Sequence, residues 1–306
     1  MLLFLLMNGK IFLKILLILA CIAGGLFFVL RNRPIVVEKE VIQDQEKEQE
    51  KEIIKEVVSG YYLYTISETE TLAKLKKEIE KDGSDENFKK VLALNRLDQK
   101  FIGMGLKLVV PQNFPEHEFA FSAFPGSLSI LNNVPKIVLI SQKNQAFAVY
   151  QAGQLIRTGP VSTGKKSTQT PNGLFTANWK AKTTNSTIDG SWVLPWYVNL
   201  DNFEGISMHQ YELPGHPASH SCIRMYENDA RFIHDFVDQW NLSSDGASII
   251  KHGTPVLIFG DYEYDKVRPW LNLVTEPNYL NMSEADLTKV LEPHMQNILG
   301  FVQEMI

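Results

Sequence analysis

The chain has 306 residues, 44% of them hydrophobic and 21% charged, and its formal net charge is -5 at pH 7. This length allows one substantial domain and a smaller one. Because the chain is acidic and has no basic block beside aromatic residues, the sequence excludes the electrostatic surface that nucleic-acid binding requires.

An apolar segment opens the chain. Residues 11–30 are interrupted only by Lys14, and such a helix spans about 30 Å of hydrocarbon. We interpret it as a single-pass transmembrane signal anchor, because the apolar run continues past Ala23, where a cleaved signal peptide would end. The alternatives are cleavage and lipidation at Cys21. Basic residues flank the run almost equally, so their distribution does not fix the orientation.

A charged segment separates this anchor from the first compact block. Residues 31–59 carry a dense mixture of acidic and basic side chains with almost nothing to bury in the middle. Such a composition is typical of a solvated stalk that holds a domain away from a membrane. A short coiled coil is the alternative.

Residues 61–114 have the pattern of a small αβ module. Residues 61–66 alternate like a strand, 71–81 and 88–94 have helical spacing, and 106–110 form a second short strand. The segment resembles the lysin motif (LysM), a glycan-binding module. The residues that carry this resemblance are Tyr64, Thr65, Ile66, Thr71, Leu72, Leu94, Asn95 and the segment 105–111. The resemblance implies binding to glycan strands, and a purely structural spacer is the alternative.

Residues 135–261 are expected to form a mainly β domain, and 262–306 a C-terminal helical tail. The domain's predicted strands are 136–141, 146–151, 155–158, 173–179, 192–200 and 255–259. One helix, residues 227–240, interrupts them, with Asn228 or Asp229 as its N-cap. In the tail we expect a helix from Ser283 that Pro293 kinks.

A polar stretch in the β domain holds the candidate chemistry. The chain has only two cysteines, Cys21 in the apolar run and Cys222, which are too differently placed to pair. In an oxidising compartment a single thiol is a liability unless it is used. Pro214 and Gly215 form a turn that lets His209 approach Cys222, and an imidazole that takes the thiol proton leaves a nucleophilic thiolate. Arg224 adds positive potential that favours a thiolate or a carboxylate-bearing substrate.

This stretch resembles the catalytic motif of the L,D-transpeptidases (the YkuD-type domain). The matching residues are Ser219, His220, Cys222, Ile223 and Arg224, supported by the segments 161–165, 170–173 and 253–256. The resemblance covers residues 135–260 and implies a β-sandwich-like fold with one helix after the motif. Two departures from the family pattern are Ser221 and Gln210, which stand where the family usually has glycine.

The resemblance also implies a mechanism on peptidoglycan stem peptides. Cys222 is expected to attack a peptide carbonyl and form a thioester, with His209 as its general base and no metal or organic cofactor. Backbone N–H groups near Cys222 would hold the oxyanion, supported by the loop residues Ser219, His220 and Ser221, and Arg224 would bind substrate. The expected location is the inner (cytoplasmic) membrane, with the catalytic domain on its periplasmic side.

Other functions are compatible with the same residues. An L,D-carboxypeptidase or hydrolase, or an enzyme that anchors envelope proteins, would share this chemistry with another acceptor. A non-catalytic peptidoglycan-binding scaffold is favoured only if Ser221 disrupts the turn. A zinc peptidase using His209, His216, His220 and Cys222 has suitable ligand types, but the prolines and glycine around His216 prevent the helix that the spacing of His216 and His220 would need.

Overall fold

The computed structural model describes residues 60–67, 72–80, 85–117 and 119–303. The predicted anchor (11–30) and stalk (31–59) lie outside these residues. Within the described ranges, no helix is both long enough and apolar enough to cross a membrane.

The N-terminal block, which we define as residues 61–114, has the expected order of strand, helix, helix, strand. Its elements are β1 (Tyr61–Thr65), α3 (Leu72–Ile79), α4 (Glu86–Leu94), the 3₁₀ helix η1 (Gln99–Phe101) and β2 (Lys107–Pro111). β1 and β2 pair antiparallel. Asn95 joins the helical and strand parts, because its side-chain amide donates to the carbonyl of Val109 and its oxygen accepts from the N–H of Val109, at 2.8 and 2.9 Å.

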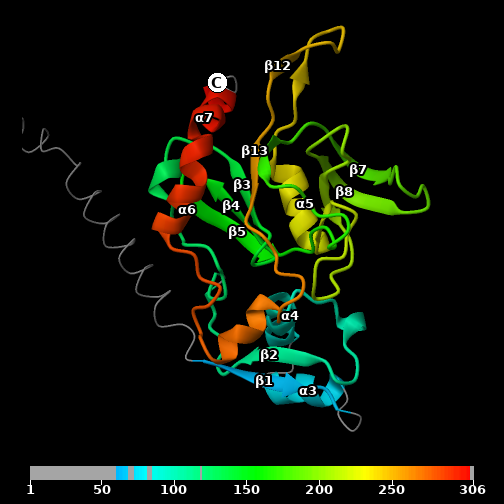
Figure 1. Ribbon diagram of the computed structural model, residues 1–306, viewed down its shortest axis with the longest axis vertical. Coiled ribbons are helices and arrows are strands. Elements are labelled where there is room, and N and C mark those ends of the chain that lie inside the picture. The colour runs from blue at the N-terminus through cyan, green and yellow to red at the C-terminus, as the bar shows by residue number, and fades with distance from the viewer. Residues whose placement is uncertain (1–59, 68–71, 81–84, 118, 304–306) are drawn as a thin grey trace, which may run out of the picture. The chain divides into compact units, whose positions relative to one another are not determined.

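A five-stranded sheet in the order β5-β4-β3-β13-β6 forms the centre of the β domain (Figure 1). Its strands are β3 (Ile137–Ser141), β4 (Ala146–Gln151), β5 (Gln154–Pro160), β6 (Gly173–Thr176) and β13 (Pro255–Phe259). Alternate residues of β3 point to opposite faces. Ile137 and Leu139 enter one apolar cluster, and Val138 and Ile140 enter another, so the sheet is covered on both sides.

A second, four-stranded sheet in the order β10-β9-β8-β7 carries the motif. Its strands are β7 (Lys180–Asn185), β8 (Val193–Asn199), β9 (Ser207–Gln210) and β10 (Ile223–Met225). The predicted strand at 173–179 is wrong at its end, because the strand stops at Thr176 and a separate strand starts at Lys180. The other strands are the short pair β11 (Asn241–Leu242) and β12 (Ile249–Lys251).

The helix after the motif is α5 (Glu227–Phe236). Its buried face packs against the core that the two sheets share, and its other face is toward solvent. The prediction that it reaches residue 240 is wrong. Lys180 donates to the carbonyls of His234 and Val237 at 2.8 and 2.7 Å, which satisfies the end of the helix from a neighbouring strand. The predicted N-cap is also wrong: Tyr226 occupies that position, and Asp229 instead forms an ion pair with Arg157 at 2.6 Å.

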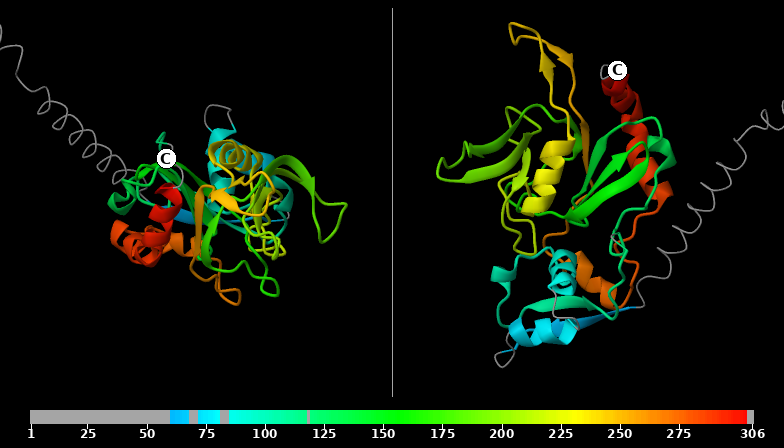
Figure 2. Two further views of the ribbon diagram at one scale, coloured as in Figure 1. Left: turned by 90° about the horizontal axis from the view of Figure 1, so that it is seen from above. Right: turned by 180° about the vertical axis from the view of Figure 1, so that it is seen from behind.

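The last two helices of the C-terminal tail cover the face of the central sheet opposite α5 (Figures 1 and 2). The tail contains η3 (Pro269–Val274), α6 (Glu284–Leu291), η4 (Glu292–His294) and α7 (Met295–Gln303), and η2 (Ser129–Leu131) precedes the domain. The predicted helix start is confirmed by a capping box between Ser283 and Asp286, and the helix is interrupted at Pro293. Trp270 of η3 is fully buried in a cluster that includes Tyr61 and Leu139. The tail therefore ties the N-terminal block to the β domain.

Candidate active site

Cys222 and His209 come together because two short strands pair in parallel. In this pairing Ile223 lies opposite Met208 and Arg224 opposite His209. Side chains alternate along a strand, so Cys222, Arg224, Ser207 and His209 project from one face of the pair. Cys222, His209 and Arg224 line a single pocket there.

The Cys222 sulfur contacts two residues at and just before the start of β9, Ser207 and Gly205. The hydroxyl of Ser207 donates to it at 3.1 Å, and the thiol donates to the carbonyl of Gly205 at 3.3 Å. Burial raises the pKa of the Cys222 thiol, although hydrogen bonds from Ser207 and the charge of Arg224 act in the opposite direction. Because desolvation disfavours the charged form, burial favours the protonated thiol as the resting form of Cys222.

His209 is buried, with 3% of its surface exposed. Its Nδ1 lies 2.9 Å from the carbonyl of Gln210, and since a carbonyl only accepts, Nδ1 carries the proton and Nε2 is left as the basic nitrogen. Burial, with a smaller contribution from the positive charge of Arg224, lowers the pKa of His209 to about 4, although the hydrogen bond to Gln210 acts in the opposite direction. Within the described residues no hydrogen bond joins His209 to Cys222. The thiol donates to the Gly205 carbonyl instead, so it must turn from Gly205 to reach the imidazole.

Two tyrosine rings hold the imidazole in place. The ring of Tyr197 stacks on His209 with centroids 6.3 Å apart, and Tyr211 meets it edge-on at 6.0 Å. The guanidinium of Arg224 lies over the ring of Tyr211, 4.6 Å from its centroid. Among the described residues no ion pair involves Arg224, so its guanidinium can accept a carboxylate from a ligand.

The turn before Cys222 contains the unusual backbone that the sequence departure indicated. Ser221 has a φ of +86°, in the left-handed region that favours glycine. Thr170 donates its hydroxyl hydrogen to the Ser221 carbonyl at 2.8 Å, and the Ser219 hydroxyl donates to the Cys222 carbonyl. Within the described part of the chain, no hydrogen bond uses the N–H groups of Ser221 and Cys222. These N–H groups are candidates for holding an oxyanion.

A second loop, residues 162–170, supports this turn. Lys165 donates its N–H to the carbonyl of Ser219 at 3.0 Å, and its ammonium lies 3.0 Å from Nε2 of His220. Gly164 has no room for a side chain, because a Cβ would lie 2.1 Å from the carbonyl of Thr168. Desolvation and the charges of Lys165 and Arg224 lower the pKa of His220, which favours its neutral form.

The hairpin formed by β7 and β8 supplies the opposite wall of the pocket. Its lining residues are Ser186, Ile188, Trp192 and Leu194. Trp192 lies against His220, with ring centroids 5.4 Å apart. Trp192 and Tyr197 thus each contact an imidazole of the motif, Trp192 that of His220 and Tyr197 that of His209.

Sequence reasoning did not find Ser207 and Gly205, the two residues in contact with the sulfur. A strand assignment for 207–210 would have found Ser207, because it then shares a face with His209. The zinc alternative has no geometric support: in the ranges that the structure describes, no three His, Cys, Asp or Glu side chains are placed to hold a metal ion.

Comparisons with known proteins identify the class of domain that this fold and site define. The family model described as the YkuD L,D-transpeptidase catalytic domain matches residues 135–258. This part of the chain is therefore an L,D-transpeptidase catalytic domain. A search of curated proteins gave no match.

Solved structures similar to this chain include L,D-transpeptidases from three organisms. The one from Stackebrandtia nassauensis is 22% identical, with 42% of this chain and 58% of that chain covered and a TM-score of 0.35. The one from Mycobacterium tuberculosis H37Rv is 19% identical, with 41% of this chain and 58% of that chain covered and a TM-score of 0.34. The E. faecium catalytic domain is 21% identical, with 41% of this chain and 98% of that chain covered and a TM-score of 0.32. The chain thus spans less than two thirds of the first two structures.

Proposed function

We propose that this protein is a peptidoglycan L,D-transpeptidase that forms a thioester on Cys222, with His209 as general base. The observation that supports the proposal best is the parallel pairing of β9 and β10, because it brings the thiol and the imidazole to the same face of the strand pair and into the same pocket. The family match over residues 135–258 supports the reaction class.

The chemistry follows from the resting geometry. When a donor stem peptide occupies the pocket, the Cys222 thiol turns from the Gly205 carbonyl and transfers its proton to Nε2 of His209 as the sulfur attacks the peptide carbonyl carbon. The negative charge on the carbonyl oxygen is held by the N–H groups of the Ser221 turn. The C–N bond then breaks, the departing amine takes the proton from His209, and a thioester remains. An acceptor amine attacks the thioester and frees the thiol.

Arg224 is the proposed binding group for a substrate carboxylate. Its guanidinium is half-buried over Tyr211, and planar guanidinium groups pair with carboxylates through two parallel hydrogen bonds. Stem peptides carry carboxylates, so this contact would orient the donor beside the sulfur.

The location and the N-terminal block enter the proposal as expectations from the sequence. Because peptidoglycan lies outside the cytoplasmic membrane, the catalytic domain would face the periplasm, with residues 11–30 as the anchor. The N-terminal block would bind glycan strands, in keeping with its strand–helix–helix–strand order. Sedimentation of the Cys222→Ala protein with purified cell-wall sacculi measures this binding without turnover.

The test is incubation of the full-length protein with purified muropeptides and mass analysis of the products. A cross-linked dimer indicates an amine acceptor, and a shortened monomer indicates water as the acceptor. Cys222→Ala should remove both products with little change in folding, since the substitution deletes only a sulfur atom. A carbapenem should add its mass to Cys222. Full activity in Cys222→Ala, or loss of activity with EDTA alone, would contradict the proposal.

A further inference from the structure

The segment that follows α4 in the N-terminal block pairs with the loop that joins His209 to Cys222. Leu97 and Pro214 form an antiparallel β-bridge. On either side of it, the N–H of Asp98 donates to the Leu213 carbonyl at 2.7 Å, and the N–H of Gly215 donates to the Arg96 carbonyl at 2.8 Å. A piece of one domain therefore holds the catalytic loop of the other through its backbone.

The side chain of Asp98 completes this pairing. Its Oδ2 accepts a hydrogen bond from the N–H of Leu213 at 2.7 Å, so Asp98 satisfies both backbone groups of a residue that is fully buried. A buried N–H without an acceptor is strongly unfavourable. The Tyr226 hydroxyl, located just after β10, donates to the Leu97 carbonyl at 2.7 Å and binds the same segment from the motif side.

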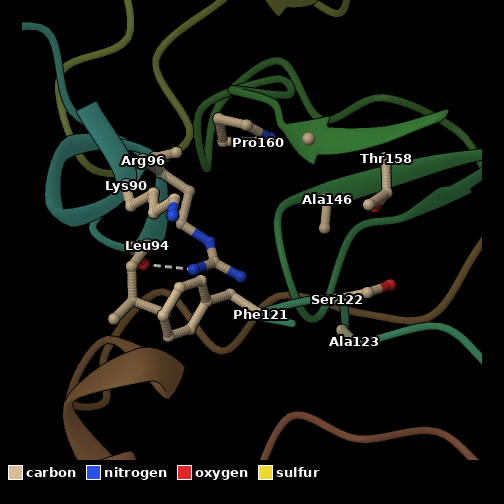
Figure 3. A pocket seen from close by; sticks show the side chains of 11 residues that line it. Lys90, Leu94, Arg96, Phe121, Ser122, Ala123, Ala146, Thr158 and Pro160 are labelled. Carbon is tan, nitrogen blue, oxygen red and sulfur yellow. Dashed lines mark hydrogen bonds between the residues drawn. The ribbon is translucent and has the colours of Figure 1, made fainter. Parts of the chain in front are cut away.

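Arg96 anchors this segment to the central sheet. Its Nε donates to the carbonyl of Asn144 at 3.0 Å, and Nη1 donates to the carbonyl of Leu94. The guanidinium lies 4.7 Å from the ring of Trp270. Figure 3 shows the Arg96 side chain extended across its pocket, with the contact to Leu94 drawn. Because Arg96 is buried and bonded to both domains, the segment it begins is a rigid support.

We propose that Asp98 is a positioning residue for the catalytic pair, acting through Leu213 on the loop between His209 and Cys222; the claim about turnover rests on the proposed transpeptidase function. The loop is held at two places, by Asp98 near its start and by residues 162–170 near the Ser221 turn. Releasing the first support lets the loop shift relative to β9. A displacement of about 1 Å at a reacting group lowers a rate by up to about 100-fold.

The test compares three variants of the full-length protein. Asp98→Ala removes the acceptor for Leu213, whereas Asp98→Asn keeps an oxygen that can accept the same hydrogen bond. Glu80→Ala is the matched control, because Glu80 accepts from the N–H of Phe88 at 2.6 Å inside the same block and away from the catalytic loop. The measurements are kcat and KM with muropeptides, and the alkylation rate of Cys222 by iodoacetamide.

Asp98→Ala should lower kcat at least about 10-fold, within the range for a misplaced reacting group, with KM nearly unchanged. Asp98→Asn should have a kcat close to that of the wild type. Glu80→Ala should leave kcat unchanged even if its melting temperature falls as much as that of Asp98→Ala. Equal kcat in Asp98→Ala and the wild type, or equal losses in Asp98→Ala and Glu80→Ala, would overturn the proposal. If Asp98→Ala does not fold, Tyr226→Phe removes one bond to the same segment, and an unchanged kcat in that variant would overturn it.

The alkylation rate separates this proposal from the proposed function. If the wild-type protein turns over no muropeptide, the proposed function fails, while the reactivity of Cys222 still reports the loop position. Asp98→Ala should then change the alkylation rate and Asp98→Asn and Glu80→Ala should not. An alkylation rate that is the same in all four proteins would show that Asp98 does not position the loop.

Discussion

Replacing His209 by glutamine removes a buried base, and the pH dependence of stability should reveal it. In the unfolded chain His209 has the ordinary pKa of 6.5, and in the folded protein burial lowers the pKa to about 4. Between these values the unfolded chain binds one more proton than the folded protein at this position. The free energy of unfolding must therefore fall as the pH falls.

The size of this effect follows from the two pKa values. A difference between 6.5 and about 4 corresponds to roughly 3 kcal/mol, because each tenfold change in the proton equilibrium is worth about 1.4 kcal/mol. The contribution is fully present above pH 6.5 and is lost as the pH approaches 4. In His209→Gln this loss is absent, while every other titrating group contributes equally to both proteins.

The assay is urea unfolding of the full-length wild type and of His209→Gln at several pH values from 7 to 4, followed by tryptophan fluorescence. We expect the stability of the wild type relative to the variant to fall by roughly 3 kcal/mol over this range, whatever the difference at pH 7. Two curves that stay parallel would refute the reasoning, because His209 would then have the same pKa folded and unfolded. A steeper loss in the variant would refute it as well.

Four further outcomes are expected. Iodoacetamide should label Cys222 more slowly at pH 7 than it labels a free thiol, and the labelling rate should rise only at higher pH than that of a free thiol, since burial raises the pKa of Cys222. Ser221→Gly should raise the free energy of unfolding in urea by about 0.5–1 kcal/mol, because the strain relieved at a left-handed φ is larger than the conformational entropy that glycine loses on folding. The control is Ala152→Gly, which changes another left-handed residue, with a φ of +46°, in a turn remote from the site. Gly164→Ala should abolish turnover in the muropeptide assay, because no Cβ fits there. A reporter enzyme fused after Glu56 should be active only outside the cytoplasm, and activity inside would overturn the proposed topology.

The sequence predicted the parts of the fold that depend on local apolar runs. The predicted strands 146–151 and 255–259 agree with β4 (Ala146–Gln151) and β13 (Pro255–Phe259) at both ends, since continuous apolar runs between turn residues are typical of buried strands. β7 (Lys180–Asn185) was missed because its residues are polar and half-exposed, and it is a strand only through pairing with β8.

Part of the candidate site could also be predicted from local sequence, whereas its contacts with distant segments could not. The residue types around Cys222 and His209 are visible in the sequence, and so is the departure at Ser221, whose φ of +86° shows the backbone that glycine would favour. The contact between Asp98 and Leu213 joins residues 115 positions apart. Such a contact leaves no local pattern, because it depends on how two domains pack.

The neutral state of the catalytic pair reconciles a reactive cysteine with the location that we propose. Only the thiolate is nucleophilic and readily oxidised, and burial favours the thiol form of Cys222 and the neutral form of His209. Transferring the proton between them would create two buried charges, which is costly without partners. A bound substrate offers the compensating contacts, because its carbonyl oxygen can take the developing charge toward the Ser221 turn. Proton transfer and attack should then occur together, and the thiol stays protected until a substrate is present.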